Sequence, residues 1–301
     1  MASSEAQKFA DLLRSGPKMA ELPLPEQRAA GEHAEDLTAE PEGVEWTAVD
    51  YGAVRGQWAV AADADAHRVV LYCFGGGHVI TSVAARRKFA GHLSRFALAR
   101  VFAVDYPLAP EHQYPADVDA VAAAYRWLLE EGVAPGSVTL AGESSAGGLV
   151  MSALLRLRGD GHQLPGGAYL MSPWVDLTCA GQSFEANIDA DLEATRPSLL
   201  RMAGQYLGGH DPTDPEVNAL FADLRSLPPL LVQVGGDEIL LDDSVALARR
   251  AGLAQVDARL EIWPEMQHFF QLGVGVYPEA AEALTVAGRW LIERTSPVAT
   301  G

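Results

Sequence analysis

The feature that most restricts the fold of this chain is a repeated alternation of short apolar runs with helix-like segments. The apolar runs, which we expect to be strands, lie at residues 67–74, 100–104, 137–141, 168–171, 230–234 and 258–263. The helix-like segments repeat apolar residues at steps of three and four, and they lie at residues 83–96, 117–130, 149–157, 242–251 and 279–293. Such alternation predicts a parallel sheet with helices on both faces. Since a hairpin signal at residues 50–52 joins two further strands, 44–49 and 54–60, we expect an α/β fold with a mostly parallel eight-stranded sheet.

Composition and charge exclude several classes of function. The chain has 301 residues, 49% hydrophobic and 21% charged, which suits one large globular domain. A formal net charge of -18 disfavours nucleic acid and anionic membrane as partners. We expect no membrane span, and the first residues lack the basic start and apolar core of a secretory signal. The two cysteines, Cys73 and Cys179, suggest no disulfide framework, so we expect a cytoplasmic protein.

The residues that suggest chemistry follow the predicted strands. They are Gly75–Gly77, Asp105, Ser144, Asp237 and His268. In open α/β sheets, ligands bind outside the carboxyl ends of the strands. We therefore expect these residues to gather at one edge of the sheet.

Residues 140–148 have the layout of a nucleophile elbow, a tight strand-to-helix turn that exposes a serine hydroxyl. The turn needs small residues two positions before and two positions after the nucleophile. Ser144 has Gly142 and Ala146 there, whereas Ser145 would place Glu143 in a crowded flank. Ser144 is therefore the predicted nucleophile, and an ordinary glycine-rich turn is the alternative.

A serine hydroxyl needs a base, and the base needs a carboxylate that orients it. In elbow-type hydrolases these residues occur in the order Ser, Asp or Glu, His, and here Ser144, Asp237 and His268 follow that order. His78 is the one rival base near the site. Three further acids follow Asp237, and we expect them to be solvated at a helix start, with bracing of the loop as the alternative: Glu238, Asp242 and Asp243.

Acyl transfer also needs hydrogen-bond donors for the oxyanion, each lowering the barrier by about 3 kcal/mol. Gly75–Gly77 can point backbone N–H groups into the site because no Cβ blocks the approach. The residue after the nucleophile, Ser145, would supply a further N–H. A flexible turn is the alternative for the glycines.

These motifs together resemble the hormone-sensitive-lipase-like group of bacterial esterases, which are α/β-hydrolases. The matching segments are residues 74–77, 105–112, 142–148, 172–177, 237–240 and 266–270. The resemblance implies oxyanion donors at Gly76 and Gly77. It also implies a helical cap made of residues 1–43 and 176–222, set on a core of residues 44–175 and 223–301. A homodimer through the edge strand 258–263 is a further implication.

Three positions depart from the family pattern. Phe74 replaces the histidine of the His-Gly-Gly-Gly segment, Ala146 replaces a glycine of the elbow, and Pro107 replaces an arginine. None of them removes a reacting group, so we expect an active enzyme.

The predicted function is that of a serine carboxylesterase acting on small or medium acyl groups, with no metal or other cofactor. The pocket candidates are His78, Val79, Trp174, Val175, Tyr206 and Leu207. A lactonase or amide deacetylase with the same triad is the close alternative. A non-catalytic small-molecule receptor on the same fold is the alternative from another class, and we expect it to lack a triad member.

Overall fold

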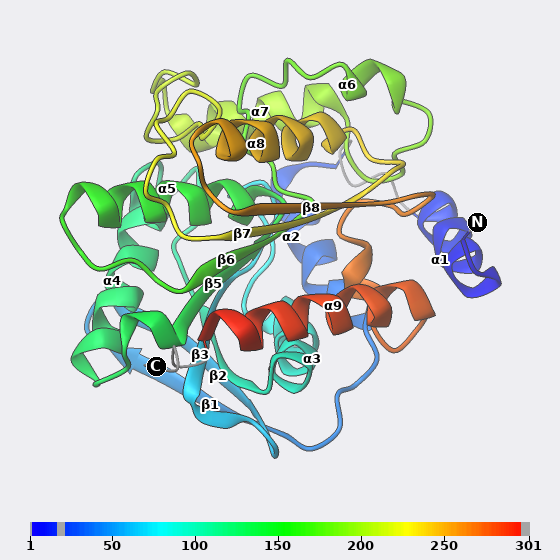
Figure 1. The fold of residues 1–301 in the computed structure, drawn as a ribbon. Helices are drawn as coiled ribbons and strands as arrows, with labels where there is room; N and C mark the ends of the chain where they lie inside the picture. Colours follow the sequence, from blue (N-terminus) through cyan, green and yellow to red (C-terminus); the bar gives the residue numbers. More distant parts are fainter. Residues whose placement is uncertain (1, 17–21, 296–301) are drawn as a thin grey trace.

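The computed structural model of the protein describes residues 2–16 and 22–295, which form a twisted eight-stranded sheet flanked by helices (Figure 1). The strands are β1 Val44–Tyr51, β2 Val54–Ala61, β3 Asp65–Cys73, β4 Ala99–Val104, β5 Val138–Glu143, β6 Gly167–Met171, β7 Leu230–Gly235 and β8 Ala258–Trp263. Their order in the sheet is β1-β2-β4-β3-β5-β6-β7-β8. β2 pairs antiparallel with β1 and β4, and the other pairs are parallel. The predicted fold class is confirmed.

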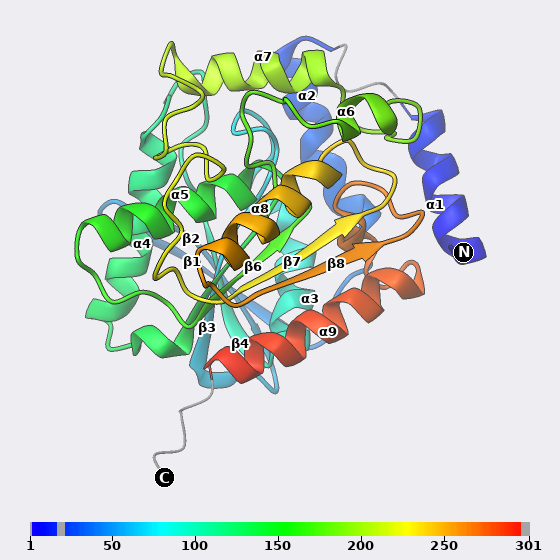
Figure 2. The ribbon, with the colours of Figure 1, turned by 45° about the horizontal axis from the view of Figure 1, so that its top comes forward.

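Helices connect the strands from β3 onward and cover both faces of the sheet. They are α1 Ser4–Ser15, α2 Leu24–Gly31, α3 Arg87–Ala97, α4 Ala116–Glu130, α5 Ser145–Gly159, α6 Ser183–Ala186, α7 Arg196–Leu207, α8 Leu241–Leu253 and α9 Pro278–Thr295. Short 3-10 turns are η2 Glu32–Leu37, η3 Ala84–Arg86, η4 Pro135–Ser137 and η5 Phe270–Gly273. Helices α3 and α9 pack together on one face, and α4, α5 and α8 cover the other (Figures 1 and 2).

The burial of each strand reflects its place in the sheet. All residues of β5, β6 and β7 are buried, as expected for strands covered on both faces. The outer strands β1 and β8 contain only exposed and partly buried residues, since each lies at an edge of the sheet.

The carboxyl ends of β7 and β8 point toward the side where α1 and α6 lie (Figure 2). Residues 176–222 contain α6 and α7 and contribute no strand. A second hydrophobic cluster, apart from the main core, joins α7 to residues that follow β3, β6 and β7. The N-terminal segment also contacts this side, because Arg28 of α2 donates to the carbonyl oxygens of Val79 at 2.8 Å and Ala109 at 2.9 Å. Residues 1, 17–21 and 296–301 of the expected cap and core lie outside the described residues.

Within residues 2–16 and 22–295, no helix combines the length and the apolar character needed to cross a membrane. In the same described ranges, no three His, Cys, Asp or Glu side chains are grouped as metal ligands.

Candidate active site

Ser144 lies in the tight turn between β5 and α5, where the backbone adopts φ 55° and ψ -125°. A non-glycine residue pays roughly 1–3 kcal/mol for such a conformation, so surrounding contacts must hold it. The Ser144 N–H donates to the Met171 carbonyl at 2.9 Å, and its carbonyl accepts from the Trp174 N–H at 2.8 Å. A Cβ on Gly142 would lie 2.4 Å from the Ala146 carbonyl oxygen, so the first flank requires glycine. The elbow geometry thus fits Ser144.

Its neighbour Ser145 is fully buried, and its Oγ accepts a hydrogen bond from the His78 N–H at 3.2 Å. His78 is also buried, its Nδ1 lying 2.8 Å from Asp117 Oδ2. The His78 ring stacks on Tyr206 at 3.7 Å between centroids, and the Tyr206 hydroxyl donates to Asp117 at 3.1 Å. These contacts give His78 a role in joining α7 to the core. They leave neither Ser145 nor His78 placed as a nucleophile or base.

The acid that contacts His268 is Glu238, which corrects the expectation of Asp237. His268 Nδ1 lies 2.8 Å from Glu238 Oε2. The other carboxylate oxygen of Glu238 accepts from Ser172 Oγ at 2.7 Å and from the Gly235 N–H at 2.6 Å. Glu238 is completely buried, so these bonds fix its orientation. With Nδ1 engaged, His268 Nε2 is the ring nitrogen available to a substrate or a nucleophile.

The backbone after β7 explains why the second of two consecutive acids faces inward. The Asp237 N–H donates to the Met266 carbonyl at 3.1 Å, which sets the direction of the turn. Asp237 is partly exposed, and burial together with the nearby Glu265 carboxylate raises its pKa. The expectation that Glu238 and Asp243 would be solvated is also wrong, since both are buried. Ser172 begins the matching segment 172–177, but its contact with the acid was not predicted from the sequence; its Oγ also accepts from the Phe269 N–H at 3.0 Å.

Carboxylates dominate the electrostatics around His268. Burial alone would lower the pKa of His268, but the hydrogen bond and charge of Glu238 act in the opposite direction. The carboxylates of Glu193 and Asp191 add to this effect, and together these groups raise the pKa of His268 to about 9. The site therefore stabilises the imidazolium form, which a general base becomes when it accepts a proton.

The glycine loop after β3 lies directly against the elbow. A Cβ on Gly75 would lie 3.0 Å from the Ser144 Cβ, so the two segments are in contact. Gly76 and Gly77 have φ 120° and φ 62°, which favour glycine at both positions. In the described part of the chain, no atom accepts a hydrogen bond from the backbone N–H of Gly76, Gly77 or Ser145. These groups are therefore free to serve as donors.

Known proteins that are similar to this chain are hydrolases. A family model described as alpha/beta hydrolase fold matches residues 70–272. The chain is 41% identical over 243 residues to an acetyl-hydrolase from Streptomyces hygroscopicus, with 81% of each chain covered. It is 37% identical over 232 residues to an esterase from Acinetobacter venetianus, covering 77% of this chain and 76% of that one. A crystal structure of an esterase from the bacterial hormone-sensitive lipase family superimposes with a TM-score of 0.94 at 38% identity, covering 98% of this chain and all of the other. The chain belongs to the hormone-sensitive-lipase-like α/β-hydrolases.

In this hydrolase, other contacts steady the glycine loop where the family motif has a histidine. Phe74 is buried and stacks on Tyr106, with 4.3 Å between ring centroids and 14° between planes. The Tyr106 hydroxyl donates to the Phe74 carbonyl, and the Thr81 hydroxyl donates to the Gly75 carbonyl. The loop is thus anchored at two consecutive carbonyl groups without the motif histidine.

The hydrolase also places a buried ion pair beneath the elbow. Glu143, which precedes Ser144, accepts from Arg86 Nε at 2.8 Å and from the Tyr72 hydroxyl at 2.7 Å. The side chains of Arg86 and Glu143 are 9% and 1% exposed. The Arg86 guanidinium also lies 5.6 Å from the ring centroid of Phe269, the residue after His268. Arg86 therefore contacts residues next to both Ser144 and His268.

The burial of the expected pocket residues favours packing over contact with substrate, and Val175 belongs to the main core rather than to the second hydrophobic cluster. All are at least nine-tenths buried: His78, Val79, Trp174, Val175, Tyr206 and Leu207. Partly buried apolar side chains pack against the second hydrophobic cluster, which contains Val79, Trp174, Tyr206 and Leu207; among them are Leu24, Ile80, Ala194 and Met202. A Cβ on Gly77 would lie only 2.2 Å from the Met202 Sδ, so Met202 of α7 covers the glycine loop.

Proposed function

We propose that this hydrolase is a serine carboxylesterase that forms an acyl-enzyme on Ser144. The observation that carries the proposal is the Glu238–His268 hydrogen bond of 2.8 Å, downstream of a serine held at positive φ in an elbow. This arrangement supplies a base whose tautomer is fixed and whose protonated form is stabilised. The esterase and acetyl-hydrolase relatives support the same class of reaction.

In the proposed reaction, Ser144 Oγ attacks the acyl carbon while His268 Nε2 accepts its proton. The N–H groups of Gly76, Gly77 and Ser145 bind the oxyanion that forms. His268 then returns the proton to the leaving alcohol as the bond to the alkoxy oxygen breaks. Water then gives a proton to His268 Nε2 as its oxygen attacks the acyl carbon. His268 returns this proton to Ser144 Oγ as the bond between Oγ and the acyl carbon breaks, which releases the carboxylic acid and restores the free enzyme.

We propose small or medium acyl groups as substrates, because Met202 lies over the glycine loop and limits the room there. A lactone or an N-acetyl amide would use the same machinery. Acetyl esters are the first substrates to test, since the Streptomyces hygroscopicus relative is named an acetyl-hydrolase.

We propose that residues 1–43 and 176–222 form a cap over a core of residues 44–175 and 223–301. Since β8 is an edge strand with Ile262 47% exposed, pairing of two copies along residues 258–263 stays our proposal for a homodimer. A cytoplasmic location likewise stays a prediction.

The test is labelling with a fluorophosphonate together with hydrolysis of p-nitrophenyl acetate. Wild-type protein and Ser145→Ala should be labelled, and Ser144→Ala should not. Glu238→Gln should lower kcat by about 10³- to 10⁴-fold, because a neutral partner no longer fixes the base, whereas Asp237→Asn should stay within a few-fold of wild type. Absence of wild-type labelling would refute the enzyme proposal, and an equal loss in Asp237→Asn would refute the assignment of the acid.

A further inference from the structure

A segment of the proposed cap, residues 187–194, contacts the loop that carries Glu238. The Asn187 Nδ2 donates to the carbonyl oxygens of Gly236 at 3.0 Å and Glu238 at 2.8 Å. Asp191 Oδ2 accepts from the Ile239 N–H at 2.8 Å. Two side chains of the segment thus bind the backbone on both sides of the acid.

The same segment contacts the loop that carries His268. Gln267 Oε1 accepts from the Leu192 N–H at 3.1 Å, and Gln267 Nε2 donates to the Ala190 carbonyl at 3.2 Å. Gln267 is only 8% exposed, so this amide is held between the segment and the loop. Because Gln267 precedes His268, the segment is tied next to the base as well as next to the acid.

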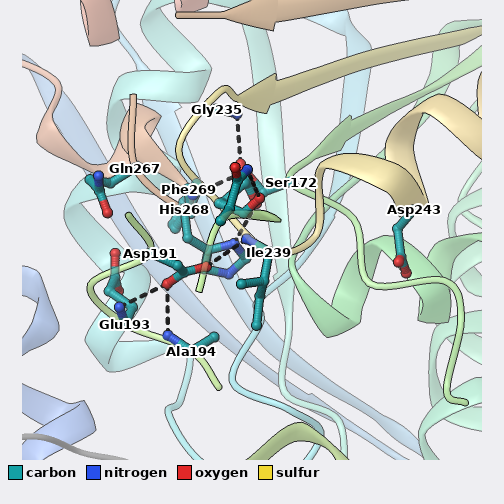
Figure 3. Close-up of polar contacts among 12 residues, drawn as sticks. Ser172, Asp191, Glu193, Ala194, Gly235, Ile239, Asp243, Gln267, His268 and Phe269 are labelled. Carbon is teal, nitrogen blue, oxygen red and sulfur yellow. Dashed lines mark hydrogen bonds and ion pairs between the residues drawn. The ribbon is translucent and has the colours of Figure 1, made fainter. Parts of the chain in front are cut away.

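Asp191 also fixes the shape of the segment itself. Its Oδ1 accepts from the N–H groups of Glu193 and Ala194, both at 2.9 Å, while Oδ2 reaches Ile239 (Figure 3). One carboxylate therefore closes a turn of the segment and joins it to the acid loop. A neutral amide at this position would lose one acceptor and the negative charge.

We propose that residues 187–194 position the acid–base pair: Asn187 and Asp191 hold the loop of Glu238, Gln267 ties the loop of His268 to the same segment, and displacement of the segment separates the pair. This inference rests on the proposed function, in which Glu238 and His268 act in catalysis. It makes Asn187 and Asp191 positioning residues, and it couples the placement of the cap to the assembly of the site.

The charged groups around His268 allow position and charge to be separated. Glu238 faces it from the loop after β7, Asp191 and Glu193 face it from the segment, and Arg86 lies over the ring of the next residue. Glu193 is exposed, and its side chain makes no hydrogen bond or ion pair within the described part of the chain. Glu193→Gln therefore removes a charge near His268 without removing a positioning contact.

The experiment measures kcat and KM for p-nitrophenyl acetate across pH in Asn187→Ala, Asp191→Asn and the control Glu193→Gln. Asn187→Ala should lower the high-pH plateau of kcat roughly 10- to 100-fold with little change in KM. It should also lower the pH midpoint, because a loosened Glu238 hydrogen bond no longer raises the pKa of His268 fully. Asp191→Asn should lower both the plateau and the midpoint. Glu193→Gln should lower the midpoint alone.

A second measurement does not depend on turnover. The proton resonance of the His268 Nδ1–H···Glu238 hydrogen bond should broaden or vanish in Asn187→Ala and Asp191→Asn, and persist in Glu193→Gln. Wild-type plateau kcat and an unchanged resonance in both positioning variants would overturn the inference. A wild-type protein that is inactive and not labelled would instead count against the proposed function. The two failures are distinguishable, because the proton resonance reports the hydrogen bond between His268 and Glu238 without any turnover. Should Asp191→Asn fail to fold, Asn187→Ala decides alone, because Asn187 is only partly buried and its backbone hydrogen bonds to Ser183 and Ala190 remain in the variant.

Discussion

The buried pair of Arg86 and Glu143 makes a sharp test of how the elbow is stabilised. Replacing Arg86 with methionine keeps much of the side-chain volume but leaves the Glu143 carboxylate buried with the Tyr72 hydroxyl as its remaining partner. Breaking a buried pair from one side costs about 3–5 kcal/mol, because an uncompensated charge stays in the interior. At about 2–4 °C per kcal/mol for a large domain, we expect the melting temperature of Arg86→Met to fall by roughly 6–20 °C.

The double variant Arg86→Met/Glu143→Gln separates charge from packing. With both charges removed, the amide introduced at position 143 would still accept the Tyr72 hydrogen bond, so most of the lost stability should return. The matched control is Arg225→Met, which breaks the pair with Asp223, where the side chains are 77% and 50% exposed. Such an exposed pair contributes little, and the control should melt close to wild type.

Differential scanning calorimetry of the four proteins, wild type included, gives the answer. A melting temperature of Arg86→Met close to that of Arg225→Met would show that the buried pair contributes no more than an exposed one. A double variant less stable than Arg86→Met would contradict the charge argument, because it would assign the loss to packing instead.

Two further outcomes follow from the structure. Because Glu238 and the nearby carboxylates raise the pKa of His268 to about 9, and only neutral imidazole accepts a proton, kcat/KM should rise with pH and reach half its maximum near that value; a profile already flat at neutral pH would contradict this. A Cβ on Gly147 would lie 2.4 Å from the Pro173 Cβ, so Gly147→Ala should lower the free energy of unfolding by about 1–3 kcal/mol in urea denaturation. Gly159→Ala, with open space around its Cβ, should leave this free energy unchanged or raise it, and equal effects of the two substitutions would refute the steric argument.

The architecture could be predicted from the sequence because local patterns determine it. A strand covered on both faces is apolar throughout, as β5 to β7 are, and an amphipathic helix repeats its apolar residues at fixed steps. The elbow could be predicted for the same reason, since the small residues that it needs lie within four positions of Ser144. Even His268 could be located, because its order in the chain and its place after a strand are properties of the sequence.

Local sequence patterns could not decide whether Asp237 or Glu238 contacts His268. Consecutive acids have almost the same chemistry, and which of them faces His268 depends on backbone hydrogen bonds between the loops after β7 and β8. The prediction of Asp237 was wrong for that reason. The buried ion pair of Glu143 with Arg86 could not be predicted either, because the two residues are 57 positions apart and charged side chains are mostly exposed.

The expected pocket residues also show what the sequence can predict and what depends on tertiary contacts. The sequence placed residues such as Trp174 and Tyr206 near the site, and the structure brings them there but buries them in the cluster between α7 and the core. The periodicity of apolar residues indicates which residues of a helix or strand become buried, because the pattern lies within that element. It does not report which elements meet, and the contacts of Asn187 and Asp191 with the loops of the acid and the base exist only once the chain has folded around them.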